Sequence, residues 1–311
     1  MIYEFNRVTN SELGVLRSFK FDRIYDQTAS QDKLFKDLQI KTLVQKVVDG
    51  FHATIFAYGQ TGSGKTYTME NIYDYSNRVL INDKEYYGIS FRSITELFKQ
   101  LRAKKEANKN FHFSIYCSFL QIYNEKIYDL LNANSLHGNG LRLRWNKEDQ
   151  FKVENLFIFE IENEEEAKAI YLQGIKNRAV APHKLNLFSS RSHSIFTIMV
   201  ESLQEDMEES VISKLQLVDL AGSERASLTG NNTNERHLKE SIDINKSLFT
   251  LRKVISTLAE SNSDSVPFIP YRESKLTCLL KQSLGGNSYC LMVSVKLIID
   301  CLYIAIRFVC E

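Results

Sequence analysis

Three glycines, a lysine and a threonine lie close together in the segment Gly-Gln-Thr-Gly-Ser-Gly-Lys-Thr, residues Gly59–Thr66. The segment fits the pattern G-x-x-x-x-G-K-[ST] without a mismatch and follows the apolar run Ala53–Ala57. Glycines allow backbone dihedral angles that side chains forbid, so successive N–H groups can form one concave anion site. Lys65 adds a positive charge, and the Thr66 hydroxyl is a ligand for Mg²⁺. These residues predict binding of the β- and γ-phosphates of a nucleotide.

Two further polar segments could complete such a site. Asp219-Leu-Ala-Gly222 follows the apolar run Leu215–Val218, and a carboxylate at this place reaches the Mg²⁺ of a phosphate-loop enzyme, usually through water. Gly222 has no side chain, so its N–H can approach the γ-phosphate. The segment Asn186–His193 carries hydroxyls suited to Mg²⁺, the γ-phosphate and the attacking water, on Ser189, Ser190 and Ser192. Alone, either segment is more often an ordinary turn.

The elements that must position these residues follow from hydrophobic periodicity. Apolar and β-branched runs predict strands at Ala53–Ala57, Phe111–Tyr123, Ile195–Leu203 and Leu215–Val218. Helical patterns occur at Asp32–Val48, Ile94–Lys104, Glu164–Gln173 and Leu238–Ala259. This order predicts an α/β fold, a central sheet with helices on both faces. The polar segments then lie at strand ends, where an open α/β sheet binds its ligand.

Composition narrows the class of protein. The chain has 311 residues, of which 43% are hydrophobic, so a large buried core is available. With three prolines and no low-complexity tract or repeat, we expect no linker and treat residues 1–311 as one domain. The net charge of +1 argues against a globally basic nucleic-acid-binding protein, although a local basic face stays possible.

Cysteines and termini indicate the compartment. The five cysteines lack the paired spacing of a zinc site or a disulfide framework, and the N-terminus has no secretory signal. We therefore expect a reducing, cytoplasmic location. The apolar run Leu297–Val309 could suggest a membrane span, but Lys296, Asp300 and Arg307 break it well short of about 20 apolar residues. A buried strand or helix is the better interpretation.

The segments GQTGSGKT, N-x-x-SSRSH and DLAGSE, in this order and at these separations, resemble the motor domain of kinesins. FDRIYDQTASQ, FLQIYNEKIYDLL, GIKNRAVA, SIDINKSL and VPFIPYRESKLT add to the resemblance, which covers about Phe19–Met292 and leaves residues 293–311 atypical. It implies a kinesin-type phosphate-loop domain that hydrolyses Mg-ATP and binds microtubules, with no nucleic-acid or membrane partner. Gly59–Thr66 would be the phosphate loop, Asn186–His193 switch I and Asp219–Glu224 switch II.

The resemblance also implies individual roles. The residues expected to contact ATP are Gly59, Gln60, Thr61, Gly62, Ser63, Gly64, Lys65, Thr66, Asn186, Ser189 and Ser192. The residues expected to bind Mg²⁺ are Thr66, Ser190 and Asp219. The residues expected to take part in catalysis are Ser190, Arg191, Gly222 and Glu224. Arg191 and Glu224 would form an ion pair that closes the switches over the γ-phosphate. Leu187 and Phe188 depart from the family, which commonly has polar residues there.

One long helix carries a candidate partner face. An apolar stripe faces the core through Ile244, Leu248, Leu251, Ile255 and Leu258. A second stripe, of Lys239, Lys246 and Lys253, is rotated from it by about 200° and so faces solvent. Such a stripe by itself usually serves only solubility. The kinesin resemblance instead implies microtubule contacts at Lys246, Arg272 and Lys275.

Two other functions compete with an ATP-driven motor. The first is a phosphate-loop GTPase or a general ATPase without a cytoskeletal partner. Such a GTPase commonly reads guanine with N-K-x-D, but Asn245-Lys246-Ser247 is followed by Leu248, so that carboxylate is missing. The other is a kinesin-like protein that binds microtubules without hydrolysis. The presence of Lys65, Asp219 and Glu224 argues against it.

Both ends of the chain depart from the kinesin pattern. Nothing before Phe19 resembles the family's first strand and its adenine-contacting R-x-R-P segment, and KLIIDCLYIAIRFVCE replaces the final helix and neck linker. We therefore expect a sheet that lacks an internal strand, with Leu297–Val309 filling part of the space, and a reduced stability from unpaired backbone groups. We also expect this chain to bind without stepping, either as a shortened or misread version of a longer motor or as a natural short form.

Overall fold

The computed structural model describes residues 3–4, 7–10, 17–71, 73–74, 79–80, 84–132, 134–135, 138–146, 151–180, 191–204, 210–224, 235–260, 268–298 and 301–308. Across these residues, no helix combines the length and the apolar character that a membrane crossing requires.

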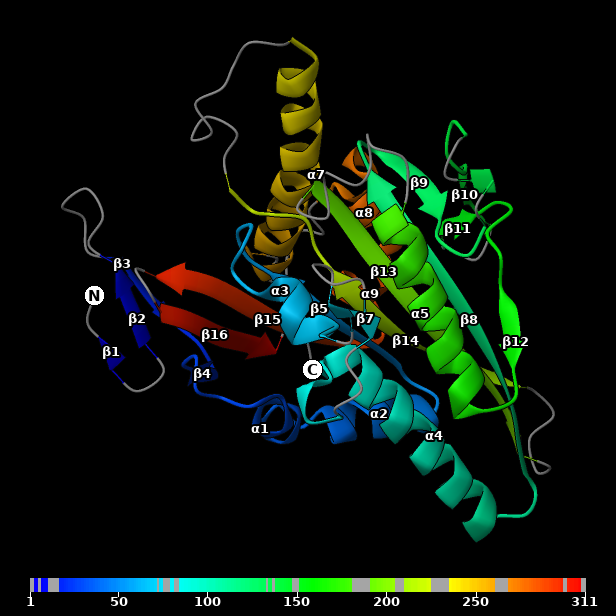
Figure 1. The fold of residues 1–311 in the computed structure, drawn as a ribbon. Coiled ribbons are helices and arrows are strands. Elements are labelled where there is room, and N and C mark those ends of the chain that lie inside the picture. Colours follow the sequence, from blue (N-terminus) through cyan, green and yellow to red (C-terminus); the bar gives the residue numbers. More distant parts are fainter. Residues whose placement is uncertain are drawn as a thin grey trace.

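A sheet of nine strands forms the centre of the molecule (Figure 1). Its order is β12 (Phe159–Ile161), β8 (Phe111–Tyr123), β13 (Ser192–Gln204), β14 (Val211–Asp219), β5 (His52–Tyr58), β15 (Ser288–Ile298), β16 (Cys301–Phe308) and β4 (Arg23–Tyr25), with β9 (Lys126–Asp129) paired to β8. The pairs β14–β5 and β5–β15 are parallel, and the others are antiparallel. The central strand β5 reads as a continuous apolar run because both of its faces are covered.

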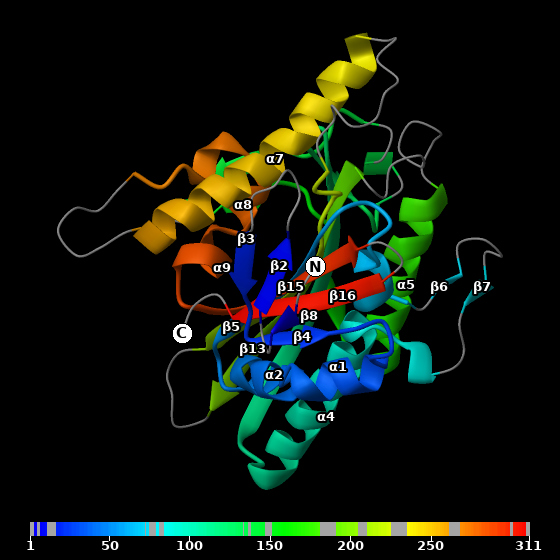
Figure 2. The same ribbon diagram turned by 90° about the vertical axis from the view of Figure 1, so that its left-hand side faces the viewer.

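Helices cover both faces of this sheet, as the sequence predicts. Figure 2 shows α1 (Gln31–Asp37), α2 (Ile40–Val48) and α4 (Ile89–Ala107) on one side and α7 (Glu235–Glu260), α8 (Lys275–Leu279) and α9 (Lys281–Gly285) on the other. The helix α5 (Glu164–Val180) packs with α4 over β8 and completes the first layer. Each layer shares its own apolar core with the sheet, one around Ile55 and Phe196 and the other around Phe56 and Leu251. The α/β prediction is thereby confirmed.

The predicted apolar stripe of α7 is confirmed where its side chains are described. Leu248 and Leu251 are buried, Ile255 and Leu258 pack against the same core, and Lys246 and Lys253 are exposed. The side chains of Lys239 and Ile244 lie outside the described set.

Smaller elements surround the main sheet. Three short strands, β1 (Tyr3–Glu4), β2 (Arg7–Asn10) and β3 (Arg17–Lys20), form an antiparallel meander. Two hairpins join β6 (Tyr73–Asp74) to β7 (Val79–Leu80) and β10 (Leu143–Trp145) to β11 (Phe151–Val153). The 3₁₀ turns η2 (Lys84–Tyr86) and η6 (Tyr271–Glu273) precede α4 and α8. Strands of two to four residues are too short for a periodicity argument, so the sequence did not predict them.

The single helix predicted over Asp32–Val48 is wrong, because the structure divides it into α1 and α2. Gln39 takes a left-handed conformation with a φ of 52°, which ends one helix and begins the next. The break lets both α1 and α2 turn an apolar face to the core, through Phe35 and Val44 among others. Neither glycine nor proline marks the break, so the sequence pattern continues through it.

The strand β16 lies between β15 and β4 and confirms that the apolar C-terminal run contributes to the sheet. It pairs antiparallel with β15 from Leu291↔Phe308 to Ile298↔Cys301 and antiparallel with β4 around Ile304↔Tyr25. The expectation of unpaired neighbours, and with it the reason for a reduced stability, is wrong because both β15 and β4 have a partner in β16.

Candidate active site

The predicted phosphate loop lies at the C-terminal end of β5 and leads into the short helix α3 (Lys65–Met69). Gly62 and Gly64 have φ values of 76° and 94°, which residues with a Cβ rarely adopt. Gly59 is required for a different reason, since a Cβ there would lie 1.9 Å from the carbonyl oxygen of Val295. The three glycines are therefore needed for the backbone path of the loop, which leads from β5 to α3 and passes close to β15.

Lys65 is buried under its own loop. Its Nζ donates to the carbonyl oxygen of Gln60 at 2.9 Å, and only 6% of the residue is exposed. Burial lowers the pKa of Lys65, while the nearby carboxylates of Asp219 and Glu224 oppose that change. The ammonium group thus has one backbone acceptor and two acidic neighbours.

Asp219 joins the loop from the neighbouring strand. It is the last residue of β14, in register with Ala57 of β5, and its Oδ2 accepts a hydrogen bond of 2.7 Å from the Thr66 hydroxyl. Its Oδ1 is buried and has no hydrogen-bond partner within the described part of the chain. Burial raises the pKa of Asp219 to about 6, the charge of Glu70 adds to this, and Arg178 opposes it.

A buried arginine connects the loop helix to Asp219. One Nη of Arg178, on α5, lies 2.6 Å from Oε2 of Glu70, directly after α3. Its other Nη donates to Oγ of Ser194 at 3.0 Å and lies 3.8 Å from Oδ2 of Asp219. Sequence reasoning missed both residues, although Arg178 belongs to GIKNRAVA, one of the segments that resemble kinesins, and Glu70 lies four residues after Thr66.

The segment after Asp219 packs directly on the phosphate loop. Glu224 accepts two hydrogen bonds from Thr61, one from its backbone N–H at 2.7 Å and one from its hydroxyl. The N–H of Ser223 donates to the carbonyl oxygen of Gly59 at 3.0 Å. A Cβ on Gly222 would lie 2.3 Å from Oγ1 of Thr61, so any larger residue there would displace the side chains of Thr61 and Glu224. Burial raises the pKa of Glu224, but the hydrogen bonds from Thr61 outweigh it and the pKa is lowered overall.

The third predicted segment is described only from Arg191 onward. Asn186, Ser189 and Ser190, and with them Leu187 and Phe188, lie outside the described residues. Arg191 immediately precedes β13. Ser192 and His193 are buried at the start of that strand, where the Ser192 hydroxyl accepts from the side-chain amide of Gln121 at 2.6 Å.

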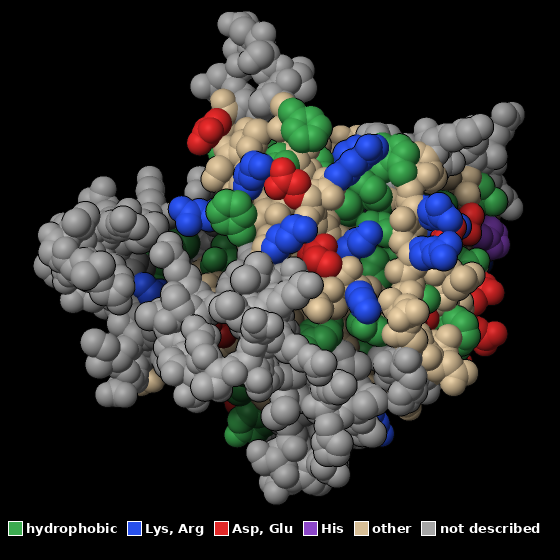
Figure 3. Space-filling model, turned by 90° about the horizontal axis from the view of Figure 1, so that it is seen from above, with side chains coloured by type: hydrophobic (Ala, Val, Ile, Leu, Met, Phe, Trp, Pro, Cys, Tyr) green, Lys and Arg blue, Asp and Glu red, His purple; other side chains and the backbone are tan. Residues whose placement is uncertain are grey.

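The predicted partner residues lie together on another face. Lys246 is exposed on α7, Arg272 lies in η6, and Lys275 begins α8, which packs against α7. Figure 3 looks down on this face and shows Lys and Arg side chains gathered on it, with a few acidic ones between them. The positive charge of Lys253 is compensated by Glu273, because its Nζ donates to Oε1 of Glu273 at 2.8 Å. We call Lys246, Arg272 and Lys275 the basic face.

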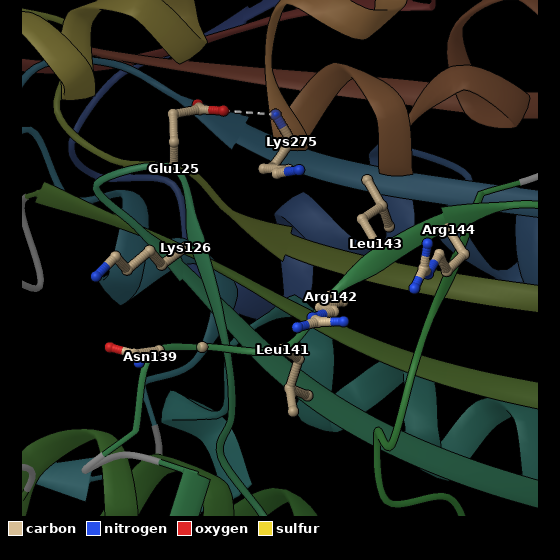
Figure 4. A pocket seen from close by; sticks show the side chains of 9 residues that line it. Glu125, Lys126, Asn139, Leu141, Arg142, Leu143, Arg144 and Lys275 are labelled. Atoms are coloured by element: carbon tan, nitrogen blue, oxygen red, sulfur yellow. Dashed lines mark hydrogen bonds between the residues drawn. The ribbon is translucent and has the colours of Figure 1, made fainter.

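A hollow of about 480 Å³ continues the basic face beyond Lys275 (Figure 4). Basic side chains from β9 and β10 and the residues beside it surround the hollow: Lys126, Arg142 and Arg144. One carboxylate, Glu125, lies at its edge, where Oε2 accepts from the backbone N–H of Lys275 at 2.8 Å. Sequence reasoning missed these three cations, because they belong to short strands and turns without a helical stripe.

The sheet, its two helical layers and the loop after β5 define a phosphate-loop α/β protein. A family model described as the kinesin motor domain matches residues 4–297, somewhat beyond both limits of the predicted resemblance. The chain therefore belongs to the kinesin motor domain family, which comprises microtubule-binding ATPase motors.

Individual relatives agree with this assignment. The kinesin-like protein KIN-12G of Oryza sativa subsp. japonica is 43% identical over 274 residues, which are 87% of this chain and 21% of the relative. The chromosome-associated kinesin KIF4 of Xenopus laevis is 38% identical over 283 residues, 91% of this chain and 22% of the relative. The chain thus spans about a fifth of the length of these curated relatives.

A solved structure is similar over most of its length. The structure of a fast kinesin, described for its implications for the ATPase mechanism and interactions with microtubules, superposes with a TM-score of 0.80 and 33% identity. The match covers 94% of this chain and 78% of that one.

Proposed function

We propose that this domain binds Mg-ATP at Gly59–Thr66 and hydrolyses it. The observation that carries the proposal is the contact of 2.7 Å between Thr66 Oγ1 and Asp219 Oδ2. It brings together two of the three predicted metal-ligating residues, directly after the glycine-rich loop. Ser190, which the family resemblance adds as a third ligand, is part of the same proposal.

The donor set fits Mg²⁺. A hard cation takes oxygen ligands, and here a hydroxyl and a carboxylate converge. Oδ1 of Asp219 is buried without a hydrogen-bond partner among the described residues, and the pKa of the group is raised to about 6. A cation beside Asp219, held directly or through water, would satisfy this oxygen and favour the charged form. When bound, Mg²⁺ would neutralise the negative charge on the phosphate oxygens.

The residues of the chain supply position and charge. Lys65 lies in the loop where its ammonium group can hold the γ-phosphate after exchanging the Gln60 carbonyl for phosphate oxygen. Gly222, without a side chain, can bring its N–H against the γ-phosphate. Closure of the switches would require Glu224 to exchange the hydrogen bonds from Thr61 for the ion pair with Arg191. The pair then orients a water in line with the γ-phosphorus, and no covalent intermediate is involved.

Microtubules are the proposed partner, and the basic face is the proposed contact. The microtubule surface is acidic, and Lys246, Arg272 and Lys275 present positive charge on one side of the molecule. Lys126 and Arg142 extend this charge around the hollow, whereas the charge of Arg144 is compensated by Glu154, whose Oε1 lies 3.0 Å from its Nε. Since these contacts are between exposed charges, we expect the affinity to fall steeply with salt.

ATP turnover by this chain, measured with and without microtubules, tests both parts of the proposal. We expect turnover that requires Mg²⁺ and rises several-fold with microtubules. GTPase activity in place of ATPase activity would contradict the nucleotide assignment. ATP turnover that microtubules do not affect would contradict the partner assignment alone. From the proposed partner we also infer a location on cytoplasmic microtubules.

A second candidate function, binding without stepping, is favoured by β16. The segment that leaves β15 returns at once as β16 and pairs with β15 on one edge and β4 on the other. A mechanical element must dock and undock with the nucleotide state, because a ligand shifts only an equilibrium between states that it binds differently. Undocking β16 would break its pairing with β15 along the strand and with β4 at Ile304–Ile306, so we infer that these residues do not provide that element.

A further inference from the structure

A buried histidine connects the nucleotide side of the molecule to the helix that carries the basic face. His193, the second residue of β13, is only 2% exposed. Its Nδ1 accepts a hydrogen bond of 3.0 Å from the backbone N–H of Ala221. Its Nε2 lies 2.8 Å from Oγ of Ser247, which is buried on α7.

The direction of both hydrogen bonds follows from chemistry. A backbone N–H can only donate, so Nδ1 of His193 carries the lone pair. In the neutral ring the proton is then on Nε2, which donates to the Ser247 hydroxyl. Burial, and next the charge of Lys65, lower the pKa of His193 to about 3, in agreement with a neutral ring. The imidazole is thus a rigid, directional spacer between one backbone amide and one hydroxyl.

The two ends of this spacer belong to different functional regions. Ala221 lies between Asp219, which contacts Thr66, and Ser223, whose N–H donates to the carbonyl oxygen of Gly59. A shift of the Ala221 peptide therefore moves the segment that faces the phosphate loop. Ser247 is adjacent to the exposed Lys246, and consecutive helical residues point about 100° apart, so one enters the core while the other meets solvent.

We propose that His193 is a positioning residue that couples the microtubule-binding helix α7 to the switch II segment through the Ala221–His193–Ser247 hydrogen bonds. The proposal rests on the proposed function. A movement of α7 on the microtubule pulls on Nε2 and is passed by the rigid ring to the Ala221 amide. The reverse path lets the nucleotide state change the affinity for microtubules, because coupling between two sites is reciprocal.

Two variants remove the Ser247 end of the relay in different ways. Ser247→Ala deletes the acceptor and leaves the ring in place. His193→Asn keeps an acceptor oxygen for the Ala221 amide but is too short to reach Ser247. Thr257→Ala is the matched control, since the Thr257 hydroxyl on the same helix donates to the carbonyl oxygen of Lys253, one turn earlier in α7.

The measurement is the ratio of microtubule dissociation constants in ADP and in a non-hydrolysable ATP analogue. We expect this ratio to exceed about 5 in the wild-type chain, as is usual for allosteric coupling, and to fall at least threefold in Ser247→Ala and His193→Asn. Thr257→Ala should keep the wild-type ratio. ATP affinity without microtubules should change less than twofold in Ser247→Ala, whereas a defect that only loosened the core would weaken it as well.

The outcomes separate this proposal from the proposed function. A wild-type ratio that persists in folded Ser247→Ala or His193→Asn overturns the relay and leaves the proposed function intact. A wild-type chain that binds neither ATP nor microtubules overturns the proposed function and the relay with it. Thermal unfolding of each variant shows whether it is folded, and His193→Asn serves as the test should Ser247→Ala fail to fold.

Discussion

The hydroxyl of Thr66 and Oδ2 of Asp219 lie 2.7 Å apart although 153 positions separate them in the sequence. The reason is the parallel pairing of β5 with β14, which brings the C-terminal ends of both strands to the same edge of the sheet. A loop that follows β5 and a carboxylate that ends β14 must therefore meet. The proposed chemistry depends on this register.

Replacement of Lys65 by alanine should abolish ATP binding. Lys65 is buried with its ammonium group in the loop, where its Nζ donates to the carbonyl oxygen of Gln60. We expect at least a 100-fold loss of affinity, a change of about 2.7 kcal/mol or more. Titration with a fluorescent ATP analogue measures it, with the exposed Lys109→Ala as the control. Wild-type affinity in Lys65→Ala would remove the loop from the site.

Glu224→Ala should bind ATP but hydrolyse it very slowly. The proposed role of Glu224 is to hold the closed switches, so its loss affects the chemical step by about 100-fold or more. Because Glu224 also accepts from the Thr61 hydroxyl, Thr61→Val separates the two roles by removing that hydrogen bond alone. At saturating ATP, single-turnover hydrolysis should be much slower in Glu224→Ala than in Thr61→Val. Normal turnover in Glu224→Ala would show that the switches close by another contact.

Charge reversal on the basic face should weaken microtubule binding at least tenfold, about 1.4 kcal/mol. The triple variant changes Lys246, Arg272 and Lys275 to glutamate. A matched triple control reverses three exposed lysines, Lys41 in α2, Lys99 in α4 and Lys109 in the turn after α4. Cosedimentation at several salt concentrations compares both variants with the wild-type chain. An equal loss in both would indicate a general charge effect and would leave the face unassigned.

The buried ion pair between Arg178 and Glu70 should behave asymmetrically. Arg178→Met leaves the carboxylate of Glu70 buried without its 2.6 Å partner, and we expect a loss of about 3–5 kcal/mol in the free energy of unfolding. The double variant Arg178→Met/Glu70→Leu removes both charges and should recover much of that loss. Urea unfolding of both variants tests this, and a double variant less stable than Arg178→Met would show that the two residues do not act as a pair.

The sequence predicts four strands of the sheet and the position of the loop between β5 and α3, because these depend on local patterns, but it does not predict the long central strand β15. The strand Phe111–Tyr123 has its predicted bounds, and the apolar run before Gly59 is the central strand β5. Contacts between distant segments, such as Arg178 with Glu70, depend on packing that no periodicity encodes. The break at Gln39 was missed for a related reason, since tertiary burial on both sides selects a left-handed residue without a glycine signal.

Acid should destabilise the wild-type protein through His193. Its pKa is about 3 in the folded chain and 6.5 when exposed, so the unfolded state binds more protons between these values. This contribution is complete well above pH 6.5 and is lost as the pH falls, by about 1.6 kcal/mol between pH 6.5 and 5. Asp219, with a pKa raised from 3.8 to about 6, acts in the opposite direction over part of that window.

The difference between two proteins isolates the histidine. We expect the unfolding free energy of His193→Asn to fall less than that of the wild-type chain between pH 6.5 and 5, because the Asp219 contribution is common to both. Chemical denaturation at a series of pH values measures it. Identical pH dependence in the two proteins would mean that His193 is not held neutral.

The chain of residues 1–311 should bind microtubules to a surface without moving them. The backbone that follows β15 is held as β16 between β15 and β4, with Ile304 paired to both Val295 and Tyr25. Releasing such a strand breaks hydrogen bonds on two edges in every cycle, whereas a docking segment must detach with each change of nucleotide. A gliding assay with surface-attached chain and ATP tests this expectation, and ATP turnover of the same preparation shows that the protein is active. Sustained directional gliding would demonstrate that β16 detaches, or that another segment performs the mechanical step.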